Sequence, residues 1–404
     1  MDTQNPYYKK NITYRFGEHN LEFMVSQDLF SSQVVDNGTQ RLLRTLLFEK
    51  IDSFDKALDL GSGYGPIGIA LKKICPHSEV HMTDRDALAL EYSKANAELN
   101  KVDDNVHVYG SLGYDDVSDT DFGLIVSNIP AKVGEHVLTH MIKDARYHLK
   151  ENGKVIIVVI DAIDDYIHKE LSTDESIEIT YERAWPGHHV YHYRFKPESH
   201  NSDTPKTTAF ERGEYSRGQS EFKFKNSKFI IKTTFHLPEF DQLSYTTSLL
   251  LTSLESLNTK AQEVLVFNPG QGYIPVVVVH AFHPTKLYLV DRDLQALQVS
   301  QENLKISNYP TENITLLHQV GINVENQNFD LVVGILPEKK DIGVYKLYLT
   351  QAHEQLKIGG LFIVSSTSTV ISRIEEFLSK QSLFEILKRE KDKGQSTILL
   401  QKRN

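Results

Sequence analysis

The chain contains one unit of sequence written twice. A constant shift of 207 residues aligns the two halves without a gap over about a hundred positions. Under this shift Leu58 matches Leu265 and the triplet Asp84-Arg85-Asp86 matches Asp291-Arg292-Asp293. A register held through so many loops indicates a duplicated domain. The length of 404 residues agrees, since it is too long for one ordinary domain and suits two.

Each copy follows the same predicted order of elements. A hairpin comes first, over 12–26 and 222–235, and an amphipathic helix follows, over 38–50 and 246–257. Apolar strands then alternate with helices, which predicts a parallel sheet covered on both faces. The fold class is therefore α/β, with two tandem doubly wound, Rossmann-like domains. A polar Pro/Ser/Thr stretch at 197–208 predicts domains at 1–200 and 210–404, joined by a linker at 201–209.

Composition and charge limit the possible surroundings of the chain. Apolar residues make up 40% of it, yet no apolar run approaches the ~20 residues of a membrane helix. Cys75 is the only cysteine, and no signal peptide is visible, so we expect a cytoplasmic protein without disulfides. The net charge of −10 is uneven: residues 1–205 hold 21 basic and 33 acidic residues, which leaves 23 and 21 of the totals of 44 and 54 for the remainder. The second half is the better platform for a polyanion.

A glycine loop in the first copy has the form of a cofactor-binding turn. The segment "LDLGSGYGPIG" (58–68) runs from a predicted strand into a helix, where glycines permit a tight turn and free N–H groups face a ligand. Asp84 ends the next strand and is placed to accept hydrogen bonds from ribose hydroxyls. Two cofactors suit this pattern. The spacing of Gly63, Gly65 and Gly68 matches a dinucleotide motif, whereas Asp59, Gly61, Gly63 and Gly65 resemble the first motif of class I S-adenosylmethionine-dependent methyltransferases.

The stretch "VSNIPAK" (126–132) separates the two cofactors. Asn128-Ile129-Pro130 ends a predicted buried strand and resembles the Asn-Pro-Pro-aromatic motif of amino-group methyltransferases. An amide oxygen that accepts an N–H of the substrate amine would orient the nitrogen lone pair toward the methyl group. Asn128 and Pro130 are thus the predicted catalytic residues. Asn-x-Pro could also be an ordinary strand-ending turn, but the glycine loop and Asp84 favour the functional interpretation.

Residues 20–200 resemble the small-subunit ribosomal RNA guanine-N2 methyltransferases, a family with a duplicated domain. The resemblance implies S-adenosylmethionine as cofactor and ribosomal RNA or the small ribosomal subunit as partner. Asp59, Gly61, Gly63 and Gly65 would hold the amino-acid end of the cofactor, Asp84 its ribose, and Gly110 and Ser111 its adenine, with Asn128 beside it. It also implies that the upstream segment 25–43 folds over the cofactor, with Phe30, Asp36 and Gly38 near it.

Two departures from that family matter. In that family the second copy is the catalyst and the first has decayed, whereas here the order is reversed. The second copy has lost its motif residues, since Val266, Asn268 and Ile335 replace Asp59, Gly61 and Asn128, while Pro269 removes a backbone donor. We therefore predict that the second domain is degenerate and non-catalytic. The family places an aromatic residue to stack on the base where this chain has Ala131. Trp185, Tyr191 and Tyr193 are possible replacements, although a buried hairpin face explains most of them. His188 and His189 lack further ligands at suitable spacing, so no metal site is predicted.

A second candidate surface opens the second copy. Residues 212–232 interleave basic residues with Tyr and Phe, a composition that suits phosphate contacts and base stacking. Lys223, Lys225 and Lys228 would then contact phosphates. The alternative is the solvated face of a hairpin, as in the first copy.

Three other functions remain open from the sequence. A methyltransferase of a protein glutamine amide or a small molecule would use the same Asn-x-Pro chemistry. An NAD-type dinucleotide-binding oxidoreductase would use the glycine loop, and a non-enzymatic ribosome-binding protein would keep only a vestigial pocket.

Overall fold

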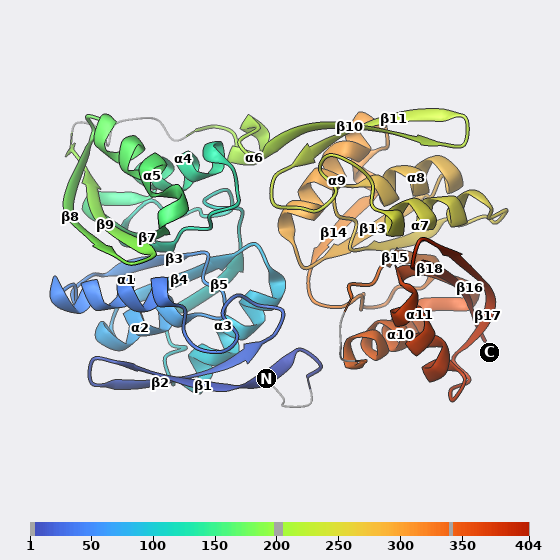
Figure 1. The fold of residues 1–404 in the computed structure, drawn as a ribbon, viewed down its shortest axis with the longest axis horizontal. Coiled ribbons are helices and arrows are strands. Elements are labelled where there is room, and N and C mark those ends of the chain that lie inside the picture. Colours follow the sequence, from blue (N-terminus) through green and yellow to red (C-terminus); the bar gives the residue numbers. More distant parts are fainter. Residues whose placement is uncertain (1–4, 198–204, 339–341, 404) are drawn as a thin grey trace. The chain divides into compact units, whose positions relative to one another are not determined.

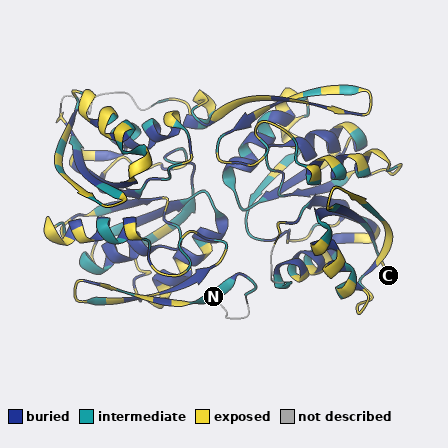
Figure 2. Ribbon diagram, in the orientation of Figure 1, coloured by how far each residue is buried: buried dark blue, intermediate teal, exposed yellow. Residues whose placement is uncertain are grey.

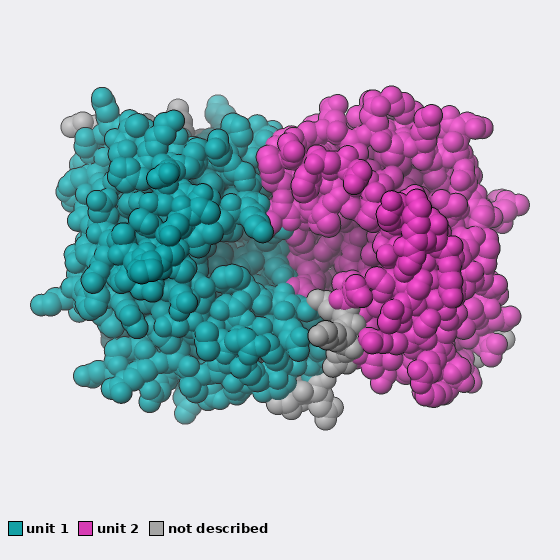
Figure 3. Space-filling view, in the orientation of Figure 1, with its two compact units in different colours: residues 1–215 teal, residues 216–404 magenta. Residues whose placement is uncertain are grey.

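Two compact units make up the chain, and each is described by itself (Figures 1 and 3). The computed structural model describes residues 5–197, 205–338 and 342–403. The units are Met1–Tyr215 and Ser216–Asn404. Of the predicted linker 201–209, residues 201–204 lie outside the described residues. Its last residue begins helix α6 (Ala209–Arg212), whose first two N–H groups donate to the Asp115 carboxylate at 2.5 and 3.0 Å. This capping holds the helix in the first unit.

The first unit consists of an N-terminal hairpin and an alternating α/β body. Its strands are β1 (Tyr8–Phe16), β2 (His19–Ser26), β3 (Lys56–Leu60), β4 (Glu79–Asp84), β5 (Val106–Gly110), β6 (Phe122–Asn128), β7 (Leu149–Ile160), β8 (Ile177–Trp185) and β9 (His188–Phe195). Its helices besides α6 are α1 (Asn37–Phe48), α2 (Pro66–Ile74), α3 (Ala87–Leu99), α4 (Glu135–Lys143), the 3₁₀ turn η1 (Asp144–Tyr147) and α5 (Asp161–Thr173).

Strands β1 and β2 pair only with each other, and the other seven form one sheet in the order β5-β4-β3-β6-β7-β9-β8. All of them are parallel except β9, which pairs antiparallel with both β7 and β8. Helices α1, α2 and α3 pack beside one another on one face of the sheet, and α4 and α5 cover the other (Figure 1). Burial on both faces explains the continuous apolar strands, which are dark blue in Figure 2.

The second unit repeats this plan element by element. Its strands are β10 (Ser216–Phe224), β11 (Ser227–Thr234), β12 (Glu263–Phe267), β13 (Lys286–Asp291), β14 (Ile314–His318), β15 (Phe329–Ile335), β16 (Leu356–Thr367), β17 (Phe384–Asp392) and β18 (Gln395–Lys402). Its helices are α7 (Tyr245–Glu255), α8 (Tyr273–Phe282), α9 (Leu294–Ile306), the 3₁₀ turn η3 (Thr311–Asn313), α10 (Gly343–Gln355) and α11 (Ser368–Leu378). The sheet order, β14-β13-β12-β15-β16-β18-β17, is that of the first unit. The predicted pair of tandem doubly wound α/β domains is confirmed.

An asparagine at the equivalent position of each unit helps to attach the hairpin to the body, and in the first unit Asn100 also exchanges hydrogen bonds with the backbone of Glu22. The fully buried Asn96 side chain, on α3, accepts from Met24 N at 2.7 Å and donates to the carbonyls of Met24 and Tyr64 at 3.0 and 2.9 Å. Asn303, on α9, does the same for Lys232 and Gln271 at 2.8 to 2.9 Å. This need for buried hydrogen bonding explains why both copies keep the residue.

No helix among the described residues has the length and apolarity that crossing a bilayer requires.

Candidate functional site

The predicted site residues of the first copy meet at one edge of its sheet. Asp59, Asp84, Gly110 and Asn128 lie at or next to the carboxyl ends of β3, β4, β5 and β6. Strand order reverses between β3 and β6, because the chain first adds strands on one side of β3 and then on the other. Ligands of open α/β sheets bind in the crevice at such a switch point.

The glycine loop adopts the conformation that its sequence predicts. Gly61 and Gly65 have φ values of +81° and +92°, which other residues rarely adopt. The N–H groups of Gly61 and Ser62 donate to Thr83 O at 2.9 and 2.8 Å, so the loop is fixed against the end of β4. A Cβ added at Gly61 or Gly63 would meet no atom within 4 Å. The loop backbone therefore faces open space in which a ligand could approach it.

Asp59 is fully buried behind this loop. Its Oδ2 accepts from the N–H of Gly68 at 2.8 Å, in the first turn of α2. Burial raises the pKa of Asp59 to about 7, with the Gly68 hydrogen bond opposing the shift and the neighbouring Asp84 charge adding to it. Asp59 thus holds the start of helix α2 against β3.

Asp84 is held by two backbone donors. Its Oδ2 accepts from Gly63 N and its Oδ1 from Asp86 N, both at 2.9 Å. Burial raises its pKa to about 6, although these hydrogen bonds favour the charged form. Gly110 pairs with Asp84 across the β4–β5 ladder, and Ser111 N donates to Asp84 O at 3.1 Å. The predicted ribose and adenine residues are therefore neighbours, while the Ser111 hydroxyl donates to Gly113 O at 2.7 Å.

The orientation of the Asn128 carboxamide is determined by two residues far away in sequence. Its Nδ2 donates to Asp36 Oδ2 at 3.0 Å and to Thr39 Oγ1 at 3.1 Å. A carboxylate can only accept, so the NH₂ group must face Asp36. Oδ1 takes part in neither bond and is left to accept from a ligand. Pro130 follows Ile129, whose N–H donates to Val158 O at 3.0 Å and continues the strand pairing to the rim.

Three buried polar atoms around the loop have no hydrogen-bond partner within the described residues. They are Asp59 Oδ1, the Tyr64 hydroxyl and Thr83 Oγ1. Buried polar atoms are normally paired, because leaving one unpaired costs roughly 1 to 3 kcal/mol. Burial and, secondly, the nearby Asp36 charge raise the pKa of Tyr64, so its hydroxyl stays protonated and able to donate. The residues present thus fit a polar ligand such as a nucleoside cofactor. Tyr64 and Thr83 escaped the sequence analysis, because only tertiary structure reveals an unpaired atom.

At the corresponding positions of the second copy, the polar groups are either lost or paired within the protein. Val266 and Pro275 stand where Asp59 and Gly68 form their hydrogen bond, so acceptor and donor have been lost together. Gln271, which replaces Tyr64, donates to the carbonyls of Thr234 and Leu237 and accepts from Thr234 N. Its polar atoms are thereby satisfied within the protein.

The Asn268 side chain forms a hydrogen bond across the edge of the second sheet where the first copy has its site. It replaces Gly61 at a φ of +48° and donates from Nδ2 to Ile335 O at 2.8 Å, which joins the ends of β12 and β15. Ile335 itself takes the place of Asn128 and offers no side-chain acceptor. These contacts support the prediction that the second copy is non-catalytic.

The segment before α1 contributes one residue directly to the site. Asp36 caps α1 by accepting from Thr39 N at 3.1 Å and also binds Asn128, as described above. A Cβ on Gly38 would lie 2.9 Å from both Asp36 Oδ2 and His188 Cδ2, so glycine permits this close packing. Phe30 is 71% exposed on the connection between β2 and α1, and its expected contact with the cofactor stays a prediction.

The aromatic hairpin β8–β9 is mostly structural. The Tyr191 and Tyr193 rings are buried, and their hydroxyls donate to Asp164 Oδ1 at 2.6 Å and Ile142 O at 2.7 Å. They cannot stack on a base. Trp185 remains half-buried, with the guanidinium groups of Arg41 and Arg183 at 5.6 and 4.7 Å from its ring centre. Of the proposed substitutes for the missing aromatic at 131, only Trp185 keeps an accessible ring.

The histidine pair at 188–189 does not converge on one point. His189 lies 3.4 Å from Asp161 and 3.1 Å from Asp164, whereas His188 packs against Gly38. Among the described residues, one other group could supply metal ligands, namely Glu79, His81 and His107. These three residues lie near the amino-terminal ends of β4 and β5, whereas Asn128 lies at the carboxyl end of β6. The Lys56 ammonium lies 3.5 Å from the Glu79 carboxylate and pairs with its negative charge.

Of the two interpretations of the basic–aromatic hairpin of the second copy, the structure agrees with the solvated hairpin face. Phe222 and Phe224 are buried in the core of the second unit, and Phe229 stacks on Phe222 at 5.3 Å. The aromatic side chains therefore do not offer a stacking surface, because the amphipathic hairpin turns them inward. Lys223, Lys225 and Lys228 are exposed, and Lys228 pairs with Glu221 at 2.6 Å.

Comparison with known proteins agrees with this geometry. The family model described as "Methyltransferase small domain" matches twice, over residues 20–175 and 237–391. Among solved structures, the T. thermophilus 16S rRNA N2 methyltransferase, in complex with AdoMet and guanosine, covers 99% of this chain and 100% of its own. Its TM-score is 0.67 at 15% identity, a likeness of fold that includes the duplication.

Curated relatives align with a single copy's length of sequence. "Uncharacterized protein YbxB" of Bacillus subtilis (strain 168) is 33% identical over 161 residues, which are 39% of this chain and 79% of that protein. The ribosomal RNA small subunit methyltransferase C of Haemophilus influenzae (strain ATCC 51907 / DSM 11121 / KW20 / Rd) is 34% identical over 161 residues, 38% of this chain. The ribosomal RNA large subunit methyltransferase G of Shewanella sp. (strain W3-18-1) is 31% identical over 159 residues, 37% of this chain. The chain spans 47% and 40%, about half or less, of the last two relatives.

Proposed function

The chain belongs to the methyltransferase small-domain family, and from this premise we propose that its N-terminal copy methylates an exocyclic amino group, namely N2 of guanine in ribosomal RNA. As a family member with two class I domains, the chain is an S-adenosylmethionine-dependent methyltransferase. The proposal concerns its acceptor and the residues that act on it. The single observation that carries it is the fixed orientation of Asn128.

The cofactor would lie over the glycine loop. When bound, S-adenosylmethionine supplies an electrophilic methyl group on a sulfonium. Gly61 and Gly63 would let the backbone approach its amino-acid end, while Asp59 keeps the loop joined to α2. Gly65, also predicted to hold the cofactor, instead lets the loop pack closely on α3, because a Cβ there would lie 3.3 Å from Ser93 Oγ. Asp84 would accept from the ribose hydroxyls, and Gly110 and Ser111 would border the adenine. The unpaired Tyr64 hydroxyl and Thr83 Oγ1 are further candidates for contacts with this ligand.

The acceptor amine would bind at Asn128. Because Asp36 and Thr39 hold Nδ2, Oδ1 can accept an N–H of the substrate without rotation of the carboxamide. The amine lone pair is then directed by a group that is already in place, so little reorganisation is needed. An exocyclic amine on a base ring is uncharged at neutral pH, so its nitrogen can attack without first losing a proton. A strong general base is therefore unnecessary before attack. The N–CH₃ bond would form as the S–CH₃ bond breaks, and the methylated nitrogen would then release one N–H proton to solvent. Pro130 would restrict the backbone conformation of the site's rim beside the amine.

A nucleic-acid acceptor fits the activities for which two relatives are named. The Haemophilus and Shewanella proteins are named as methyltransferases of small- and large-subunit ribosomal RNA, respectively. The missing aromatic at Ala131 means that the base must be held in another way, and Trp185 between Arg41 and Arg183 is the available ring. We therefore expect a base, rather than a protein amide, as the acceptor.

The decisive experiment is methyl transfer from a radiolabelled donor. Purified protein is incubated with naked small- and large-subunit ribosomal RNA, with assembled subunits and with a protein extract. Asn128→Ala serves as the matched inactive control, since it removes only the carboxamide. Label in the guanine N2 position of RNA, absent with the control, is the expected result. Label confined to protein would instead favour a glutamine amide and would refute the proposed substrate.

A further inference from the structure

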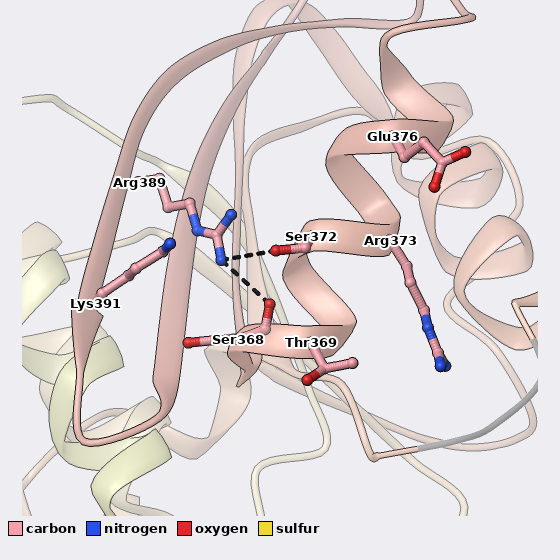
Figure 4. A pocket seen from close by; sticks show the side chains of 7 residues that line it. All are labelled: Ser368, Thr369, Ser372, Arg373, Glu376, Arg389 and Lys391. Atoms are coloured by element: carbon pink, nitrogen blue, oxygen red, sulfur yellow. Dashed lines mark hydrogen bonds between the residues drawn. The ribbon is translucent and has the colours of Figure 1, made fainter.

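An open depression in the second unit has the character of an anion-binding surface. It is lined by residues of helix α11 and strand β17 and has a volume of about 430 Å³. Figure 4 shows its side chains, which are Ser368, Thr369, Ser372, Arg373, Glu376, Arg389 and Lys391. We propose that this α11–β17 groove binds phosphates of the RNA substrate, an inference that rests on the proposed function.

Arg389 forms the fixed part of the groove. Its side chain is 15% exposed and forms an ion pair through Nη1 with Glu375. Its Nη2 donates to Ser368 O, Ser372 Oγ and Ser396 Oγ, each at 3.2 Å. The guanidinium is thus held in place at the bottom of the groove between helix and strand. The ion pair with Glu375 and the three Nη2 hydrogen bonds occupy most of its donors, so Arg389 joins α11 to β17 and shapes the groove.

The rim of the groove carries two further exposed cations. Arg373 on α11 and Lys391 on β17 are both exposed, and their side chains lie on either side of Arg389 in Figure 4. Glu376 is the one acidic lining residue, and Lys380 neutralises it at 2.9 Å. The hydroxyls of Ser368, Thr369 and Ser372 add short donors that suit phosphate oxygens. The groove is open to solvent, which suits a polymer backbone better than an enclosed small molecule.

The first copy provides an internal comparison, because the shift of 207 residues holds through both elements. The seven lining positions of the second copy carry three cations and one anion, a net charge of +2. The equivalent positions in the first copy carry three anions and one cation, a net charge of −2. The anions are Asp161, Asp165 and Glu182, and the cation is Lys169. The seven equivalent positions therefore have opposite net charge in the two copies, although the helix and strand that carry them are the same. Only the second copy, which lost its cofactor motif, has a net positive charge there.

Two exposed charges can be removed without disturbing Arg389. The double variant Arg373→Gln/Lys391→Gln is compared with Lys260→Gln/Lys305→Gln, which removes two exposed lysines of the same unit outside the groove. Affinity for a fluorescein-labelled 20-nucleotide single-stranded RNA is measured over a range of salt concentrations. Each lost phosphate contact should lower the slope of log affinity against log salt by about 0.7. The groove variant should therefore lose a slope of about 1.4 and bind about tenfold more weakly at ~0.1 M salt. The control variant should match the wild type.

The outcomes separate this inference from the proposed function. Equal affinity and slope for the groove variant and the wild type would overturn the groove, even if the wild type methylates RNA. Loss of affinity in the groove variant, with no methyl transfer to RNA by the wild type, would support the groove and refute the proposed function. Equal weakening by the control variant would mean that RNA responds to overall charge, which would also overturn the groove. Binding of fluorescein-labelled polyglutamate, with no binding of RNA, would point to an acidic protein partner and overturn it as well.

Discussion

Replacement of Asn128 by aspartate tests the orientation of its carboxamide with a single atomic change. The side chain keeps its shape, but an oxygen takes the place of the NH₂ group that now donates to Asp36 Oδ2 at 3.0 Å. Two carboxylate oxygens at that separation repel each other by about 5 kcal/mol at an effective dielectric constant of ~20. The fully ionised variant must therefore move the new carboxylate or bind a proton between the two groups.

The consequence is an activity that depends on pH in an unusual direction. At pH 8 we expect Asn128→Asp to lose about 100- to 1000-fold in kcat, the effect of removing one oriented dipole. As the pH falls toward 6, a proton shared by the two carboxyl groups restores a donor toward Asp36 and leaves a carbonyl to accept the amine. The ratio of the variant's kcat to that of the wild type should therefore rise on acidification.

The assay is methyl transfer to the acceptor that the wild type uses, at saturating cofactor, between pH 6 and 8. Asn128→Ala is the control, because it cannot bind the proton and should be equally inactive at every pH. Cofactor affinity, measured by calorimetry, should change less than about threefold in Asn128→Ala, since we place Asn128 at the acceptor. A pH-independent ratio for Asn128→Asp would refute the assigned orientation. Equal losses of cofactor binding and turnover in Asn128→Ala would mean that the residue is structural.

Three further predictions follow from the two copies. The raised pKa of Asp84, about 6, means that its acceptor carboxylate is lost as the pH falls through 6, so cofactor affinity should weaken between pH 7 and 5; Asp84→Asn should reduce this dependence in calorimetric titrations and leave the part due to Asp59, whose pKa is about 7, and a flat wild-type profile would contradict it. Asp291→Ala should leave methyl transfer unchanged, and a large drop would assign catalysis to the wrong copy. Asn96→Ala removes three buried hydrogen bonds and should cost the first unit roughly 3 kcal/mol, or about 6 to 12 °C in Tm. Asn303→Ala should do the same to the second unit, and calorimetric transitions that do not move would show that the asparagines do not hold the hairpins.

The regular elements around the site could be predicted from the sequence almost to the residue. The alternating apolar stretches "KALDL", "PIGIALKKI", "EVHMTD" and "ALALEYSKANAEL" coincide with β3, α2, β4 and α3. Their hydrophobic periodicity is clear, turn-forming residues mark their ends, and the second copy repeats the same pattern. Because the carboxyl ends of parallel strands share an edge, the positions of Asp59, Asp84 and Asn128 followed from these elements.

The local sequence pattern did not predict the structure correctly where burial in the core decides which conformation or face a segment adopts. The run "VVVV" (276–279) favours a strand by propensity, yet it lies within helix α8, where all four side chains are buried. The register of the repeat, which aligns it with α2, is the better guide. Likewise the alternating Lys and Phe residues of β10 suggested an exposed stacking face. The core of the second unit instead takes Phe222 and Phe224.

The sequence by itself determined the duplication, the fold class, the cofactor loop and the copy that retained its amide. Only the tertiary structure decided how that amide is directed, because Asp36 and Thr39, its partners, lie 92 and 89 residues away in the chain. It alone also revealed the unpaired atoms of Asp59, Tyr64 and Thr83. Periodicity and motif spacing record which backbone elements form, whereas hydrogen-bond pairing between distant side chains depends on where the folded sheet brings them.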